Sequence, residues 1–201
     1  MITYRALEEA EVCRDLFRHF IRHQTVTDCW RRENGSWVIR NNPFIDDWTE
    51  ADYQVLVDCL RRTVRSGGFV YGAFRDGQLK GFVSVESEPF GSKRQYLDLT
   101  SIHVSEDQRN AGIGKTLFAA AKAWAGAHGA KKLYISAHSS VESQAFYKKW
   151  AVWKRGSTAK SMWSRSPGIA SWNAWFNTAG ANGMHHAILT EERTKSGREQ
   201  T

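Results

Sequence analysis

Residues 96–114 combine an alternating strand pattern with a glycine-containing turn that precedes a helix. Leu97 and Leu99 alternate with polar neighbours, a period of two that is typical of a half-buried strand. The next apolar residues are Ile102 and Val104, so the alternation slips by one position. A slip of one residue turns every later side chain to the other face, which indicates a strand end or a β-bulge. We therefore expect main-chain groups near Ile102 that a ligand can bind.

The turn that follows has the sequence Arg-Asn-Ala-Gly-Ile-Gly over residues 109–114. Glycines at the start of a helix let main-chain N–H groups converge, and with the positive end of the helix dipole they form a phosphate site. Arg109 and Lys115 add positive charge. A glycine-bearing loop before an ordinary helix is the alternative interpretation. A nucleotide-binding loop of the Gly-x-x-x-x-Gly-Lys-Thr type is excluded, because Arg109 stands where that motif requires glycine.

About thirty residues further on, the chain reads Ala-Phe-Tyr-Lys-Lys at residues 145–149. With this motif, residues 96–150 resemble the acetyl-coenzyme A-dependent N-acetyltransferases of the GNAT superfamily. The resemblance implies an α/β fold in which a mixed, mostly antiparallel sheet is flanked by helices. It covers residues 1–150 in element order, and we expect this part to form the acetyltransferase domain.

The resemblance also implies acetyl-coenzyme A as the cosubstrate, with no metal. In this family the Arg-x-x-Gly-x-Gly turn holds the pyrophosphate and a bulged strand pairs with the pantetheine arm. The residues that the resemblance assigns to cofactor binding are Ile102, His103, Val104, Arg109, Asn110, Ala111, Gly112, Ile113, Gly114 and Lys115. Ser140 stands where many members carry an asparagine that bonds the pantetheine arm, and a serine hydroxyl can also donate.

The implied reaction transfers an acetyl group from a thioester to an amine. The amine must lose a proton, the developing oxyanion needs a fixed donor, and the departing thiolate benefits from a proton. The resemblance implies Tyr147 as the general acid; a core tyrosine on an amphipathic helix is the alternative. Asp98 stands where the histone acetyltransferase branch carries its glutamate base, and Glu86 and Glu88 are alternatives, each also explained as a solvated strand residue. Proximity alone supplies much of the rate, so a dedicated base is not required.

The N-terminal part of the chain predicts a strand at residues 2–7 and then a helix whose apolar residues have helical spacing. These residues are Val12, Leu16, Phe17 and Phe20. Residues 23–48 break this periodicity and are interpreted as a long, irregular aromatic loop. Such loops often carry binding function.

In the GNAT superfamily the region after the first helix helps to form the acceptor pocket. The resemblance therefore makes Trp30 and Trp37, together with Glu86, candidate substrate-binding residues. An aromatic cap over the sheet is the alternative explanation for the two tryptophans.

The middle of the chain carries clear boundary signals. Thr49 is a helix N-cap, with Asp52 at the capping-box position, and Gly67-Gly68 ends that helix. Residues 69–74 and 79–85 are two strands joined at Asp76-Gly77, a strong hairpin signal. The continuous apolar run at 133–135 predicts a strand covered on both faces.

Composition limits the classes of protein to consider. At 201 residues the chain is one domain by length, and it has no apolar run long enough to span a membrane. Its three cysteines lack metal-ligand spacing, which favours buried thiols in a reducing cytoplasm. The net charge of +7 suggests a nucleic-acid partner. However, residues 151–201 hold seven Lys/Arg against three Asp/Glu, so more than half of the surplus lies there and nucleic-acid binding is disfavoured.

After Trp150 the regular pattern is lost, and we interpret residues 151–201 as an atypical, irregular tail. A disordered extension explains it poorly, because disordered segments are poor in aromatics and this tail carries four tryptophans. Our hypothesis is that the loss of one G after the Trp150 codon shifted the reading frame and replaced the family's C-terminal strands. A gene sequence without a G-rich slip site there would refute it. Loss of the closing strands would expose a sheet edge and impair activity.

The sequence thus predicts a cytoplasmic N-acetyltransferase that acts on a primary amine of a small molecule or peptide. A catalytically impaired GNAT-like protein that binds coenzyme A is the first alternative, and a basic nucleic-acid-binding domain is the second. Members of the superfamily are often dimers, so a homodimer stays open.

Overall fold

The computed structural model describes residues 1–34, 36–137, 139–150 and 170–173. An antiparallel sheet has the strand order β1-β4-β5-β7, and a second sheet has the order β6-β8-β9. The strands of the first are β1 (Ile2–Ala6), β4 (Phe69–Arg75), β5 (Gln78–Val85) and β7 (Ser101–Val104). Those of the second are β6 (Tyr96–Asp98), β8 (Lys132–Ala137) and β9 (Ala170–Asn173). Only β6 and β8 pair in parallel among these strands, which confirms the mixed, mostly antiparallel α/β fold.

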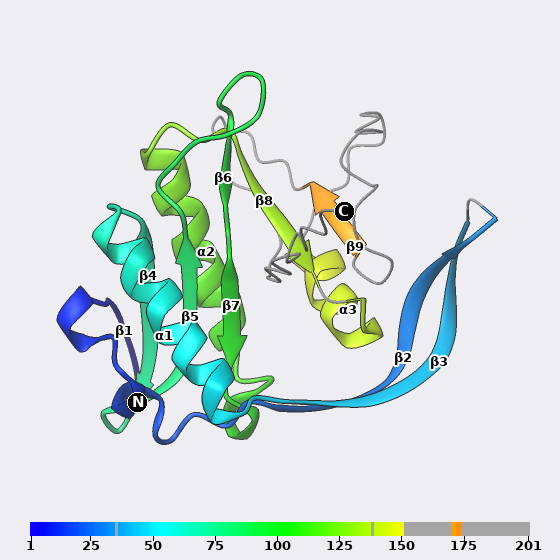
Figure 1. Cartoon of the computed structure of the whole chain (residues 1–201), viewed down its shortest axis with the longest axis horizontal. Coiled ribbons are helices and arrows are strands. Elements are labelled where there is room, and N and C mark those ends of the chain that lie inside the picture. Colours follow the sequence, from blue (N-terminus) through cyan, green and yellow to red (C-terminus); the bar gives the residue numbers. More distant parts are fainter. Residues whose placement is uncertain (35, 138, 151–169, 174–201) are drawn as a thin grey trace, which may run out of the picture.

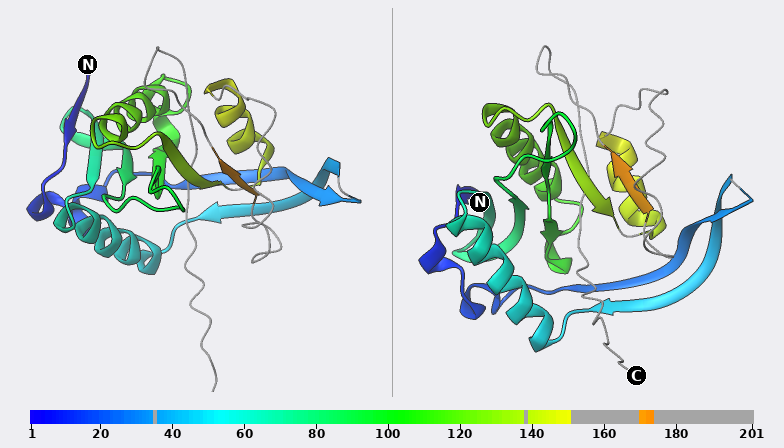
Figure 2. Two further views of the ribbon diagram at one scale, coloured as in Figure 1. Left: turned by 90° about the horizontal axis from the view of Figure 1, so that it is seen from above. Right: turned by 45° about the horizontal axis from the view of Figure 1, so that its top comes forward.

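Two long helices cover opposite faces of the larger sheet (Figures 1 and 2). α1 (Glu50–Arg65) packs on the core that contains Phe82, and α2 (Ile113–Ala127) packs on the core that contains Leu99. α1 begins with the predicted capping box, in which Asp52 N donates to Thr49 Oγ1 and Thr49 N donates to Asp52 Oδ2. A third helix, α3 (Val141–Trp150), follows β8. None of the helices in the described part is long and apolar enough to cross a membrane.

The helix predicted over residues 12–20 is wrong. The chain instead forms two short 3₁₀ helices, η1 (Glu9–Glu11) and η2 (Arg14–Phe17), separated by an extended backbone at Cys13. Phe17 and Phe20 are nevertheless buried. A spacing of three residues satisfies a 3₁₀ turn as well as an α-helix, so apolar spacing alone did not distinguish the two.

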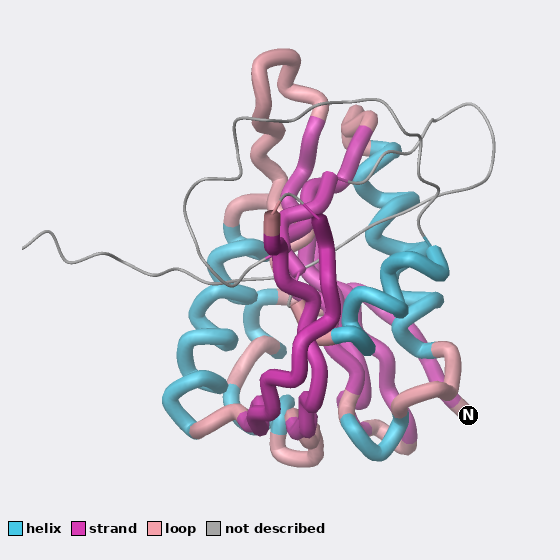
Figure 3. The backbone as a smooth tube through the Cα atoms, turned by 90° about the vertical axis from the view of Figure 1, so that its right-hand side faces the viewer, coloured by secondary structure: helices cyan, strands magenta, loops and turns pink. Residues whose placement is uncertain are grey.

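The irregular loop predicted over residues 23–48 is also wrong. This segment is a long antiparallel hairpin of β2 (His23–Glu33) and β3 (Ser36–Asp47) that extends away from the sheet (Figures 1 and 2) and points toward the viewer in Figure 3. The register shifts between Val26 and Asp28, which interrupts the alternation within one strand. β3 is largely exposed on both faces, so its sequence lacks the apolar-polar alternation of a half-buried strand.

The remaining boundaries follow the sequence. Asp76 and Gly77 both have positive φ, at 51° and 77°, as expected of the tight turn between β4 and β5. The predicted strand at residues 133–135 lies within β8. The tail contributes β9, which pairs with β8. Apart from β9, the irregular tail and the reading-frame hypothesis concern residues 151–169 and 174–201, which lie outside the described part of the chain.

Candidate functional site

A β-bulge lies where the sequence alternation slips. Glu86 N donates to Asp98 O, and Thr100 N donates to Ser84 O at 3.1 Å, which sets one register between the two segments. One step later Ser84 is the partner of Ser101 in the β5–β7 ladder. Ser84 therefore faces two successive residues, which defines a bulge. Leu97 and Leu99 point into the α2 core, so in a regular strand Ile102 would point to the opposite face. The bulge turns Ile102 toward the α2 core as well.

Strands β7 and β8 separate just beyond this bulge. β6 pairs with β8, and Leu99 N still donates to Tyr134 O at 3.0 Å. From Ser101 onward, β7 pairs with β5, and among the described residues no hydrogen bond joins it to β8, whose far edge pairs with β9. A gap therefore opens between β7 and β8, toward the end where α2 begins.

Main-chain groups of β7 line this gap. Ser105 N donates to Lys80 O at 2.9 Å, which fixes the phase of the antiparallel ladder. Because hydrogen-bonded pairs alternate along such a ladder, His103 pairs with β5 through its main chain. Ile102 and Val104 therefore direct their N–H and C=O groups to the other edge, toward the gap. These are the main-chain groups that the sequence predicts to be available near Ile102.

The glycine turn presents a set of unused N–H groups at the open end of the gap. Asn110 and Gly112 have positive φ, at 64° and 79°, and α2 begins at Ile113. Within the described chain, the main-chain N–H groups of residues 110–114 donate to no other residue. Thr116 N makes the first helical bond, to Gly112 O. Converging N–H groups at a helix N-terminus, with Lys115 in its first turn, suit an anionic group.

α3 packs directly over this turn. A Cβ added at Gly114 would lie 3.1 Å from Phe146 Cε2, so glycine allows α3 to approach. The next residue, Tyr147, is 8% exposed and belongs to the α2 core, with its ring centroid 5.0 Å from that of Phe146. Burial raises the pKa of the Tyr147 hydroxyl, and the charge of Arg22 partly opposes this. Tyr147 therefore stays protonated at neutral pH, as a proton donor must.

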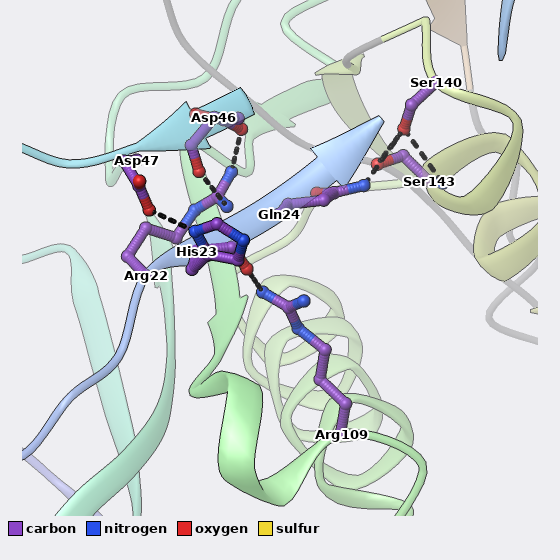
Figure 4. Close-up of polar contacts among 8 residues, drawn as sticks. All are labelled: Arg22, His23, Gln24, Asp46, Asp47, Arg109, Ser140 and Ser143. Carbon is purple, nitrogen blue, oxygen red and sulfur yellow. Dashed lines mark hydrogen bonds and ion pairs between the residues drawn. The ribbon is translucent and has the colours of Figure 1, made fainter. Parts of the chain in front are cut away.

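Arg109 does not extend into the solvent above the turn. Its guanidinium is half-buried and donates to the carbonyl of His23 at the start of β2 (Figure 4). Nearby, Arg22 pairs with Asp46 and His23 Nδ1 lies 2.6 Å from Asp47 Oδ1, so both strands of the hairpin are anchored beside the turn.

Ser140 lies on the opposite side of the gap, between β8 and α3. Its hydroxyl accepts from Ser143 N at 3.3 Å, so Ser140 is the N-cap of α3. It also donates to Ser143 Oγ at 2.9 Å and accepts from Gln24 Nε2 at 3.5 Å (Figure 4). Because Arg109 contacts His23 and Ser140 contacts Gln24, strand β2 crosses the open end of the gap and links its two sides.

The carboxylates Asp98 and Glu86 lie opposite each other at the closed end of the gap. Glu86 Oε1 accepts from Thr63 Oγ1 of α1 at 2.6 Å. Burial, and secondly the charge of Glu86, raise the pKa of Asp98 to about 7. A carboxylate with this pKa can accept a proton near neutral pH. Glu88, in contrast, pairs with Arg94 in an exposed loop.

The tryptophans assigned to the acceptor pocket lie on the hairpin. Trp30 N donates to Ser139 O at 2.8 Å, which places Trp30 beside the turn that contains Ser140. Trp37 pairs with Arg32 near the tip of the hairpin, far along the arm from Glu86. The structure thus brings Trp30 to the gap and leaves Trp37 away from it.

The sequence did not indicate a role for the side chains of three residues at the base of the hairpin. Arg22 immediately precedes β2, Gln24 is its second residue, and the imidazole of His103 lies on the α1 face of β7, against Trp48. No motif marks them, because the hairpin itself was not predicted.

The chain matches the sequence profile of the Acetyltransferase (GNAT) family over residues 26–151. No match was found among curated proteins. A Bacillus anthracis protein assigned as a streptothricin acetyltransferase, solved in complex with acetyl coenzyme A, has a TM-score of 0.64 and 19% identity, covering 88% of this chain and 99% of that one. A nourseothricin acetyltransferase has a TM-score of 0.55 and 18% identity, over 72% and 79% of the two chains. A Brucella melitensis ribosomal-protein-alanine N-acetyltransferase has a TM-score of 0.52 and 17% identity, covering 79% of this chain and 96% of that one.

Proposed function

Because the chain belongs to the Acetyltransferase (GNAT) family, we propose that it transfers an acetyl group from acetyl-coenzyme A to a primary amine of a small molecule or peptide. The observation that supports this most is the gap between β7 and β8. It has the main-chain groups of Ile102 and Val104 along one side and the unused N–H groups of residues 110–114 at its open end.

The two sets of groups fit the two halves of coenzyme A. The diphosphate is anionic and requires several donors, which the turn before α2 provides together with the exposed Lys115. The pantetheine arm contains amides that pair with an open strand edge as an added strand would. Acetyl-coenzyme A supplies an activated acyl group when it is bound.

The chain's own residues then have three tasks. The N–H groups on the open edge of β7 polarise the thioester carbonyl, since fixed donors stabilise the charge that develops on its oxygen. Tyr147 keeps its proton and donates it to the sulfur of the leaving thiolate. Asp98, whose pKa is raised to about 7, accepts a proton from the ammonium of the acceptor, and the neutral amine then attacks the thioester carbonyl. We place the reaction in the cytoplasm, in line with the absence of any disulfide among the three cysteines.

A thiol-release assay on the full chain tests the proposal. Acetyl-coenzyme A is incubated with a panel of primary amines, and we expect thiol release that depends on the amine. Coenzyme A should also shift the amide resonances of residues 110–114 in a ¹⁵N-labelled sample. Shifts without amine-dependent release would support the catalytically impaired coenzyme A-binding alternative instead. Unshifted amides would refute the cofactor site itself.

A further inference from the structure

Two buried polar atoms at the base of the hairpin lack hydrogen-bond partners. Among the described residues, Nε of Arg22 and Nε2 of His103 are the buried side-chain nitrogen or oxygen atoms without one. The Arg22 side chain is only 10% exposed. A buried polar group left without a partner costs about 1–3 kcal/mol, and two such groups in one place require an explanation.

The two atoms belong to one cluster. The Arg22 guanidinium lies 5.3 Å from the centre of the Trp48 ring, and the His103 ring lies 4.6 Å from the same ring. Arg22 is fixed by Asp46, to which it donates through its terminal nitrogens, so its Nε is directed elsewhere. Phe82 also packs against His103, with ring centroids 5.4 Å apart.

The electrostatics of the cluster favour an anion. Burial lowers the pKa of His103 well below its usual value, and the charges of Arg22 and Arg109 add to this effect, so the imidazole is neutral. The pKa of Arg109 is also lowered, first by burial and then by Arg22, while Glu106 and Asp46 only partly offset this. A further cation would be repelled here. A neutral imidazole with its proton on Nε2 donates, as does Arg22 Nε–H, so an anionic group within reach of both nitrogens would satisfy both.

The cluster lies on the face of β7 opposite the α2 core, and Arg109 of the glycine turn borders it. Ile102 and Val104 pack toward α2, on the face where the glycine turn lies. His103 stands between them on β7, so its side chain projects from the opposite face of the same strand. A group transferred across the edge of β7 therefore has the glycine turn on one face and the Arg22–His103 pair on the other.

We propose that Arg22 Nε and His103 Nε2 bind a carboxylate of the acceptor, so that the preferred substrate is an amine that also carries a carboxylate, such as an amino acid or a short peptide. The proposal rests on the acetyltransferase function above. Two N–H donors match the two oxygens of a planar carboxylate, whereas a phosphate would require more donors. Arg22 and His103 are then specificity-determining residues.

Matched acceptors test the proposal. Each amine is assayed as the free acid and as its primary amide, with the same carbon skeleton. For the wild type we expect kcat/KM to be at least tenfold higher for the acid at a pH where both amines are equally ionised. Arg22→Lys keeps the charge but loses Nε–H, so the ratio of kcat/KM for the acid to that for the amide should fall toward one. Equal rates for acid and amide in the wild type would overturn the proposal and indicate that a water molecule occupies the pair.

Two variants at His103 separate a polar role from packing. His103→Gln keeps a donor near the position of Nε2 and should keep most of the acid preference. His103→Phe keeps a ring against Trp48 but has no donor, and it should lose the preference while still binding coenzyme A. If both variants retain the preference, the imidazole does not bind the acceptor.

A binding measurement makes the test independent of turnover. In protein with ¹⁵N-labelled histidine, the His103 Nε2 resonance is the one that is missing from the His103→Phe spectrum. With coenzyme A bound, acetate should shift this resonance, whereas acetamide should not. Coenzyme A binding without an acetate effect would refute the carboxylate site alone. Failure of coenzyme A to bind would refute the proposed function first.

Discussion

The guanidinium of Arg109 donates a hydrogen bond to the main-chain carbonyl of His23, eighty-six positions earlier in the chain. Arg109 is the first residue of the glycine turn, and His23 is the first residue of the hairpin. The same loop is held a second time, because Ser105 Oγ accepts from Ile21 N at 2.9 Å. The turn proposed to bind diphosphate and the arm proposed to border the acceptor therefore share one anchor.

Replacing Arg109 by Gln should weaken both ends of this link. A hydrogen bond to a charged group is worth about 1.5–3 kcal/mol, so its loss should increase hydrogen exchange in the segment that contains His23. Coenzyme A affinity should fall severalfold, since positive charge beside the turn is lost. Arg40→Gln is the control, because Arg40 pairs with Glu33 on the exposed part of the hairpin. Unchanged exchange around His23 would show that the bond does not hold the hairpin.

Two glycines at the ends of α2 should respond in opposite directions to alanine. Gly112 has a φ of +79°, a conformation that costs an L-residue about 1–2 kcal/mol, so Gly112→Ala should be destabilised by that amount. Gly126 lies in the last turn of the helix with open space around it, so Gly126→Ala should gain about 0.5–1 kcal/mol. Urea unfolding measures both. Only Gly112→Ala should lose coenzyme A affinity, and a stabilised Gly112→Ala would contradict the left-handed turn.

The raised pKa of Asp98 makes stability depend on pH. In the folded protein this pKa is about 7, against 3.8 for the unfolded group. Between these values the folded state binds the extra proton, so the free energy of unfolding falls as pH rises, by up to about 1.4 kcal/mol per pH unit. Asn mimics the protonated carboxyl. Asp98→Asn should therefore match the wild type in urea unfolding near pH 4 and exceed it at pH 8. Equal stability at both pH values would show that the Asp98 pKa is not raised.

The glycine turn and the strands beside it could be predicted because local rules act there. The slip after Leu99 appears in the structure as a bulge, and Asp76-Gly77 forms the expected turn, since both depend on neighbouring residues. The family and the fold follow from these same segments. Turns and bulges can be predicted from the sequence because their main-chain conformation depends largely on neighbouring residues.

The hairpin and its anchors could not be predicted for a physical reason. β2 and β3 pair with each other away from the main sheet, so neither strand shows a buried face in its sequence. Its contacts to Arg109 and Ser140 connect residues more than eighty positions apart, and no local pattern encodes them. His103 was assigned for its main chain; its side chain became informative only when β7 and the hairpin base were seen together.

Tyr147→Phe should separate chemistry from binding. The substitution keeps the ring that packs in the α2 core and removes only the hydroxyl, so folding and coenzyme A affinity should be retained. General acid catalysis contributes about 10²–10⁴-fold, and kcat should fall within that range. Because burial raises the pKa of the Tyr147 hydroxyl, its ionisation should not limit the rate at neutral pH. Tyr71→Phe, on β4 and away from the gap, is the matched control and should keep its rate. A Tyr147→Phe enzyme with wild-type kcat would mean that the thiolate departs without a proton from this residue, because no other change accompanies the loss of the hydroxyl.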